Sequence, residues 1–391
     1  MKNHSTSKID KLIQKGVIIP NPLSVYIGTE VDTDRISGDG VAIYSGCKIY
    51  GNSTLILPGT KIGYEGPVTI ENCQIGPLVE LKGGFFKESV FLKNSNSGPG
   101  SHIREGTIFE EGSRTSHTVG LKQTVLFPFV TLGSLINFCD CLMSGGTSPK
   151  DHSEVGSSYI HFNYTPNQDK TTPTLLGDVP RGVMLNQRPI FLGGQGGIVG
   201  PCRLEFGTII AAGSICRKDE LRPGRLMIEV PKQGVNMPFV PGMYRSVKRV
   251  MINNIIYIAN LVALMQWYDH VRSQFISDDF SEPLFNGLTE KLDMIIDERI
   301  ARLCAFSQKM PGSAKAYKEN VKEHASALVL DQKNELYNQW SEIDAFFSER
   351  RRLKAGDADR DIFLENIHHA IKGFGKDYIR AIKSLSLEDT H

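Results

Sequence analysis

Aliphatic residues recur at about every fifth or sixth position through the first part of the chain, and small or polar residues fill the gaps. The stretch 199–217 shows this rhythm most clearly, and shorter runs repeat it at 41–46, 68–76 and 103–108. A period of six does not fit one helix face, but it fits short strands that turn a corner in every repeat. Aliphatic side chains stack between coils, and Gly, Asn, Asp and Ser favour the corners. The pattern predicts a parallel β-helix of hexapeptide repeats.

The composition changes near residue 240, because only six of the 38 Gly follow it. Beyond that point the apolar residues take helical spacing. We therefore expect three parts, the last with a separate core: a lead-in over 1–22, a β-helix domain over 23–240 and an α-helical domain over 241–391.

One segment of the β-helix, 144–197, is polar and rich in Pro and Gly. We expect an inserted loop there. Insertions of that size in a compact repeat often carry function.

The overall charge limits the classes of binding partner to expect, and the cysteines indicate the cellular compartment. Lys and Arg number 44 against 43 acidic residues, which gives no electrostatic case for nucleic acid or an acidic membrane. The seven Cys are odd in number and mostly occupy apolar repeat positions, so we expect reduced thiols and a cytoplasmic protein. Asn and Gln residues interrupt the most apolar segment, 250–268, which favours a packed helix over a membrane span.

Three segments together carry a resemblance to a known family: 101–112 followed by Lys122, 163–170, and 199–213. They resemble the acetyltransferase half of bifunctional GlmU, the uridyltransferase/glucosamine-1-phosphate acetyltransferase of amino-sugar nucleotide synthesis. The resemblance implies a left-handed β-helix, a homotrimer and acetyl-coenzyme A as co-substrate. The uridyltransferase half has no counterpart in the motifs, so we do not expect nucleotide transfer.

The resemblance also implies roles for individual residues. Arg104 and Lys122 are eighteen positions apart, which is three hexapeptides, and they match the pair that holds the sugar phosphate. The other implied contacts are Asn163, Tyr164 and Lys170 near the substrate and thioester, and Gly194 and Ala212 along the coenzyme A groove.

The general base is where this sequence departs from the family. Counting forward from Lys122 places Ser134 at the position of the family's catalytic His, and Ser cannot act as that base. Counting backward from Asn163 differs by about six residues, so a repeat or loop is inserted near 145–152. That stretch and its sequel supply His152, Glu154 and His161 as candidates for acid–base chemistry, with His117 as a further candidate.

We therefore expect an acyl- or acetyl-coenzyme A-dependent N-transferase acting on an amino-sugar phosphate or a nucleotide-linked amino sugar. Hexapeptide carbonic anhydrases bind zinc through His, but the His spacing here does not favour a metal site, and none is expected. The alternative is a non-catalytic trimer that binds a sugar nucleotide or scaffolds a partner, and Ser134 favours it.

Overall fold

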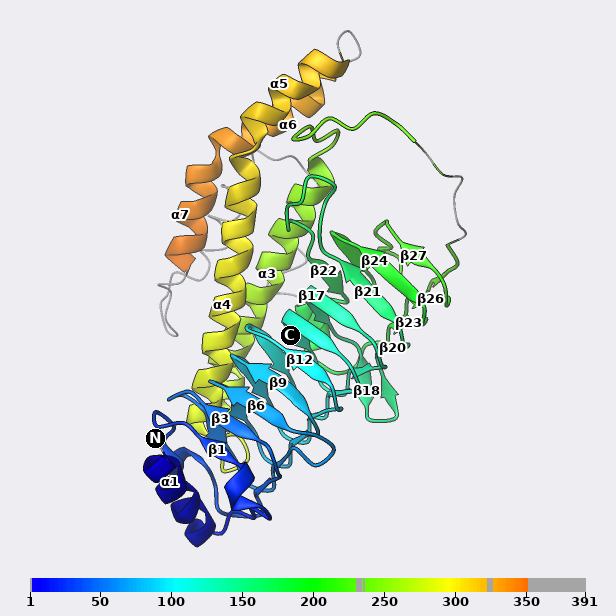
Figure 1. Ribbon diagram of the computed structural model, residues 1–391. Helices are drawn as coiled ribbons and strands as arrows, with labels where there is room; N and C mark the ends of the chain where they lie inside the picture. The colour runs from blue at the N-terminus through cyan, green and yellow to red at the C-terminus, as the bar shows by residue number, and fades with distance from the viewer. Residues whose placement is uncertain (1, 230–233, 235, 322–325, 351–391) are drawn as a thin grey trace.

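The computed structural model describes residues 2–229, 234, 236–321 and 326–350. Parallel strands coil into a left-handed β-helix with three faces, and a group of helices lies along one side (Figure 1). The expected fold class is confirmed. The segment 351–391 of the expected helical domain lies outside the described residues.

The strands of each face run in register from coil to coil. Face 1 consists of β1 (Tyr26–Ile27), β3 (Lys48–Tyr50), β6 (Val68–Glu71), β9 (Gly84–Lys87), β12 (Ser101–Ile103), the first halves of β15 (Gly120–Leu126) and β17 (Asn137–Met143), β21 (Tyr159–Phe162), β24 (Gly196–Val199) and β27 (Ile215–Cys216). Face 2 consists of β4 (Leu55–Ile56), β7 (Gln74–Ile75), β10 (Ser89–Phe91), β13 (Thr107–Phe109), the second halves of β15 and β17, β22 (Thr174–Leu176) and β25 (Cys202–Leu204).

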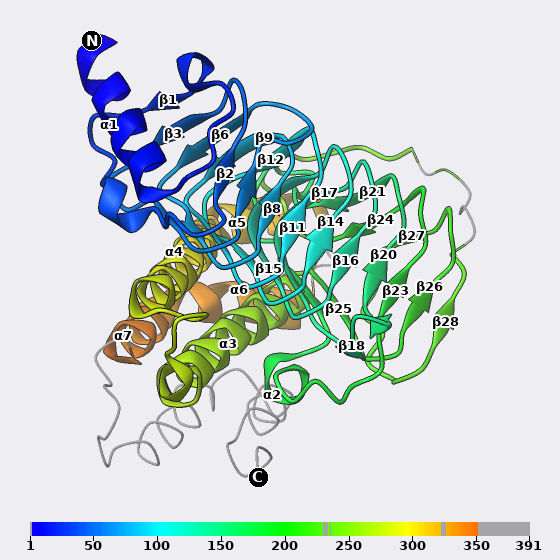
Figure 2. The same cartoon turned by 90° about the horizontal axis from the view of Figure 1, so that it is seen from below.

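Face 3 completes the triangle, and Figure 2 shows its strands side by side along the stack of coils. It consists of β2 (Ala42–Ile43), β5 (Lys61–Ile62), β8 (Glu80–Leu81), β11 (Asn96–Ser97), β14 (Arg114–Thr115), β16 (Thr131–Leu132), β20 (Glu154–Val155), β23 (Phe191–Leu192), β26 (Ile209–Ile210) and β28 (Leu226–Met227). We call the edges between the faces corner 1/2, corner 2/3 and corner 3/1.

The core of the β-helix is a set of inward columns. On face 1 one buried column pairs Ile27 with Ile49, then Ile70 and Phe86, and continues upward through the coils. Corners need residues that tolerate a left-handed backbone, and corner 1/2 stacks several with positive φ: Asn72, Glu88, Gly106, Gln123 and Asp140. Each hexapeptide thus supplies one strand with an inward residue and the corner that leads to the next face.

The segment 144–197 differs from the single loop that the sequence predicts. Strands β20 to β24 run through it and continue the faces, so its polar composition belongs to three excursions between strands. The first is a hairpin of β18 (Gly146–Ser148) and β19 (Asp151–His152) at corner 2/3, where the sequence predicts an insertion near 145–152. The second is the loop 163–173 at corner 1/2. The third contains α2 (Val179–Gly182).

Helices flank the coil at its start and along face 2. The lead-in forms α1 (Lys2–Lys15), and short 3-10 turns follow at Pro22–Ser24 and Thr33–Arg35. After the coil come α3 (Lys248–His270), a 3-10 turn at Arg272–Phe275, α4 (Glu282–Ser307), α5 (Met310–Val321), α6 (Ala327–Asn338) and α7 (Trp340–Arg350).

The antiparallel pair α3 and α4 covers face 2. Residues of face 2 that alternation would turn outward, such as Val90, Ile108 and Leu142, are fully buried and belong to one hydrophobic cluster with Leu288 and Leu292 of α4. The expectation of a separate helical core is therefore wrong for this part of α3 and α4, while a second hydrophobic cluster joins other residues of α3 and α4 to α5, α6 and α7. The reason is that the strands of face 2 carry apolar side chains on their inner and outer surfaces, so the outer surface must be shielded from water by the helices.

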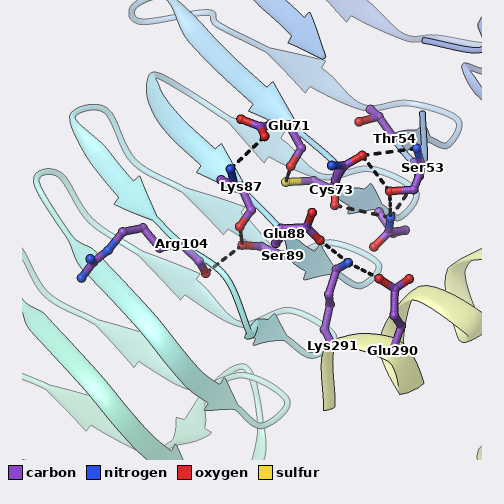
Figure 3. Close-up of polar contacts among 12 residues, drawn as sticks. Ser53, Thr54, Glu71, Cys73, Lys87, Glu88, Ser89, Arg104, Glu290 and Lys291 are labelled. Atoms are coloured by element: carbon purple, nitrogen blue, oxygen red, sulfur yellow. Dashed lines mark hydrogen bonds and ion pairs between the residues drawn. The ribbon is translucent and has the colours of Figure 1, made fainter. Parts of the chain in front are cut away.

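Polar contacts hold both helices to the coil. From α4, the fully buried Lys291 pairs with Glu88 of corner 1/2 and with Glu290, 2.8 Å away (Figure 3). From α3, the Tyr268 hydroxyl donates a hydrogen bond of 2.5 Å to the buried Glu110. Burial raises the pKa of Glu110 to about 7.

One described helical segment, 248–275, is long and apolar enough by length and composition to cross a membrane. In the structure 67% of its most apolar window is buried. The packed helix that the sequence predicts over this segment accounts for that composition.

A chain that ends at residue 240 should fail to give a stable β-helix. Removing α3 and α4 exposes a complete apolar face of parallel strands, and each large side chain returned to water loses about 1.5–3 kcal/mol. We expect the fragment to aggregate and bind a hydrophobic dye, whereas the full chain does neither, as gel filtration and dye fluorescence would report. A monodisperse fragment with the circular dichroism of a β-helix would contradict this expectation.

Candidate functional site

A group of cations lies on the outer surface of face 1, next to corner 1/2. Arg104 and Lys122 occupy successive coils, because the residues just before them, Ile103 and Leu121, are register partners. The expectation that both project from one face is confirmed. Lys122 pairs with Glu105 at 2.5 Å. Burial raises the pKa of this carboxyl, but the hydrogen bond from Lys122, a backbone hydrogen bond and the charges of Lys122 and Arg104 together lower it below its ordinary value.

Arg104 has a different environment from Lys122. Its guanidinium lies 3.8 Å from the Cys139 sulfur, and its side chain extends away from the polar contacts around Lys291 (Figure 3). Burial raises the pKa of the Cys139 thiol, so this neighbour is a neutral group. Among the described residues no carboxylate pairs with Arg104. The guanidinium is therefore a cation that an anionic ligand can neutralise.

The loop 163–173 lies further along the same corner, with the coil of Cys139 and Asp140 between it and Lys122. Asn163 donates a hydrogen bond of 3.2 Å from its Nδ2 to the buried Asp140. Lys170 lies over the ring of Tyr164, with its nitrogen 5.1 Å from the ring centroid. The structure thus brings five predicted residues to one edge of face 1: Arg104, Lys122, Asn163, Tyr164 and Lys170.

His161 points into the β-helix instead of toward this surface. It pairs with Ile198 in the inward column of face 1, and its imidazole is only 4% exposed. Its Nε2 lies 2.9 Å from the Thr174 hydroxyl and its Nδ1 lies 2.5 Å from the Cys139 carbonyl oxygen. Burial lowers the pKa of His161 to about 4, so the ring is neutral at physiological pH. This geometry disfavours direct proton transfer with a ligand on face 1.

His152 and Glu154 lie together but on another side of the coil. His152 ends the hairpin at corner 2/3, Glu154 projects outward from face 3, and their Nε2 and Oε2 atoms are 4.0 Å apart. His152 Nδ1 is buried without a hydrogen-bond partner among the described residues. The separation from Glu154 is that of an ion pair and exceeds hydrogen-bond length, so Nε2 is the ring nitrogen that remains available to exchange a proton.

The remaining candidates gather at corner 3/1, the other edge of face 1. A Cβ on Gly193 would meet the Ala212 backbone nitrogen at 2.3 Å, and a Cβ on Gly194 would meet the Ser157 carbonyl oxygen at 2.7 Å. The successive coils therefore pack backbone against backbone here. Ser134 belongs to the same corner, since its N–H donates to Ser157 Oγ at 3.2 Å, and His117 lies one coil below.

Two residues at the cation surface escaped the sequence analysis. Asp140 is buried at corner 1/2, and Arg299, only 1% exposed, reaches it from α4 with a nitrogen–oxygen distance of 3.1 Å. Asp140 lies in the sequence Cys139-Asp-Cys141 and takes a positive φ in the structure, like the other residues of its corner. No sequence signal linked a helical Arg to a corner far earlier in the chain.

A search for groups of three or more His, Cys, Asp or Glu residues arranged to hold a metal ion finds none in the described part of the chain. Its Cys are free thiols.

Comparison with known proteins finds relatives that are named bifunctional protein GlmU. The Thermotoga maritima protein is 27% identical over 216 residues, which are 54% of this chain and 42% of the relative. The Clostridium novyi protein is 27% identical over 233 residues, 57% of this chain and 43% of the relative. The Synechococcus elongatus protein is 27% identical over 221 residues, 56% and 43% of the two chains.

These matches confirm the resemblance that the motifs indicate, and the left-handed β-helix agrees with it. The matched region spans less than half the length of these relatives. No family model matches the chain.

The buried His161 should make the fold sensitive to acid. Its pKa falls from the ordinary value of 6.5 to about 4 on folding, so the native state loses stability as the pH drops from about 6.5 toward 4. Replacing His161 by Gln should flatten this dependence by up to about 3 kcal/mol in urea titrations across that window. The exposed His102→Gln serves as the control, and equal acid sensitivity of both variants and the wild type would contradict the assignment.

Proposed function

We propose that this relative of the GlmU proteins transfers an acetyl or other acyl group from coenzyme A to the amine of a sugar that bears a phosphate or a nucleotide. The observation that carries the proposal is the placement of Arg104 and Lys122 on successive coils beside Lys170. Of the carboxylates described at this edge of face 1, Glu105 pairs with Lys122 and Asp140 pairs with Arg299, so Arg104 and Lys170 leave a surplus positive charge for a phosphate. The transfer itself calls for no metal.

The two edges of face 1 have properties suited to the two substrates. The cation edge supplies charge for the sugar phosphate. The opposite corner, with Gly194 and Ala212, has closely packed backbone and small side chains, which allow the pantetheine arm of coenzyme A to approach the coil.

The reaction requires a base for the sugar amine. As its nitrogen attacks the thioester carbonyl, an N–C bond forms, the C–S bond breaks, the amine loses a proton and the coenzyme A thiolate gains one. We propose Nε2 of His152 as the group that accepts the amine proton, with the nearby carboxylate of Glu154 stabilising the charged ring that results. His161 is the weaker choice because its neutral ring is held in the core.

The base and the cations lie on different faces of one chain, so the complete site requires a second copy. We propose a cytoplasmic homotrimer in which face 1 of one subunit lies against face 3 of the next. Exposed apolar rows support this contact, since Ile160, Phe162 and Ile215 project from face 1 and Phe191, Ile209 and Leu226 from face 3. Face 2 cannot take part in it because α3 and α4 cover it.

A second function is favoured by one observation. Ser134 stands where the family resemblance places the base, and a trimer without a base would bind a sugar nucleotide or serve as a scaffold. Thiol release from acetyl-coenzyme A distinguishes the two functions directly.

Substitutions at the cation edge and at the base should have separable effects on transfer. With glucosamine 1-phosphate and related amino-sugar phosphates, Lys122→Ala should weaken acceptor binding by about 1–3 kcal/mol, whereas His152→Ala should lower kcat by about 10²–10⁴. Lys11→Ala, which breaks the exposed ion pair with Asp34 at the start of the coil, and His270→Ala at the end of α3 are matched controls that should change neither.

Thiol release measured with a chromogenic disulfide gives both parameters. Absence of thiol release from the wild type with every acceptor would leave the binding trimer as the function. Transfer that survives His152→Ala would move the base to His117.

The proposed trimer can be tested by its mass in solution. Light scattering should give a trimer mass, and Ile209→Asp together with Leu226→Asp should convert it to monomers, because charges on face 3 cannot be buried at the interface. Loss of thiol release in these monomers would support a shared site. A wild-type monomer of 43.3 kDa would rule out the shared site.

A further inference from the structure

Helix α4 follows corner 1/2 along the coil axis. Its Lys291 meets Glu88, and its Arg299 meets Asp140 three coils further on. Eight helical residues rise about 12 Å, and three steps of a parallel strand stack cover about 14 Å. The two lengths agree, so buried cations two turns apart on α4 contact the same column of corner residues.

The contact of Arg299 with Asp140 differs from that of Lys291 with Glu88 in its neighbouring residues. Lys291 binds only carboxylates, at a corner that is an ordinary tight turn. Arg299 binds the last tight turn, at Asp140, and its Nη1 also donates to the Lys170 carbonyl oxygen at 3.1 Å. The next coil replaces the tight turn by the loop 163–173, so Arg299 lies where the corner gives way to the candidate substrate loop.

The orientation of Asn163 depends on this arrangement. A carboxylate paired with arginine only accepts hydrogen bonds, so Asp140 holds the NH₂ group of the Asn163 side chain toward itself. The amide oxygen of Asn163 then points away from Asp140. Asp140 is buried, and the Arg299 guanidinium is the cation that pairs with it. One arginine thus holds the Asn163 side chain, through Asp140, and the backbone of Lys170.

We propose that Arg299 is a positioning residue for acceptor binding, which it controls by fixing the loop that carries Asn163 and Lys170. This inference rests on the proposed acyltransferase function for its kinetic consequence. Its structural consequence, an ordered loop 163–173, stands independently. It also gives the helices a role in the site, because α4 sets the acceptor loop and covers face 2 at the same time.

The experiment compares Arg299→Met with Lys291→Met. Both remove a buried cation of α4 that pairs with a corner carboxylate, so both should lower the melting temperature. Only Arg299→Met should speed hydrogen–deuterium exchange across 163–173, and only it should raise the KM for glucosamine 1-phosphate or the active acceptor, by about tenfold, which is 1.4 kcal/mol. Arg299→Lys should restore part of both effects.

Two further variants separate positioning from general destabilisation. The pair Arg299→Met with Asp140→Asn leaves no unpaired buried charge, so it should regain stability while the KM stays high. Adding Arg299→Met to Asn163→Ala should raise the KM by less than it does alone, because the side chain that it positions is already absent.

Equal KM changes in Arg299→Met and Lys291→Met, or unchanged exchange in the loop, would overturn the proposal. A wild type without transfer would refute the proposed function alone. The exchange comparison would then still decide whether Arg299 orders the loop.

Discussion

The hydrogen-bond ladder between successive coils is the constraint on which the rest of the structure depends. Each coil can pair with its neighbours only if every face keeps its register, as in the column from Ile27 to Phe86. The ladder fixes which positions point inward, and it leaves chemistry to outward positions and to excursions between strands. Arg104 and Lys122 occupy outward positions of the coil, whereas the hairpin and the loop 163–173 are excursions between strands.

The β-helix could be predicted from the sequence because its determinants are local. One inward aliphatic residue and one small or polar corner residue recur in each hexapeptide, and the same periodicity correctly places Arg104 and Lys122 on successive coils of one face. The insertion near 145–152 was found by the same counting, from two registers that disagree. Such counting works wherever the structure repeats itself along the chain.

The remaining features could not be found this way because they depend on contacts between distant segments. His161 resembles a surface base in the sequence, yet it takes the place of an aliphatic residue in the column beside Phe138, with ring centroids 6.5 Å apart. Arg299 resembles any charge on a helix, yet it is buried against Asp140. The shared core of face 2 and α4 escaped prediction for the same reason, since a composition change marks a change of secondary structure and not the boundary of a core.

The short helix α1 has a consequence for how copies of the molecule meet end to end. A solenoid presents unpaired strand edges at its ends, and such edges invite further strands from other molecules. Leu12 of α1 is fully buried, and the ammonium of Lys8 donates to the carbonyl oxygens of Gly28, Thr29 and Val31 beside the first strand. With that end closed, two copies cannot join head to tail into a growing fibril, and association is directed to the sides of the triangle.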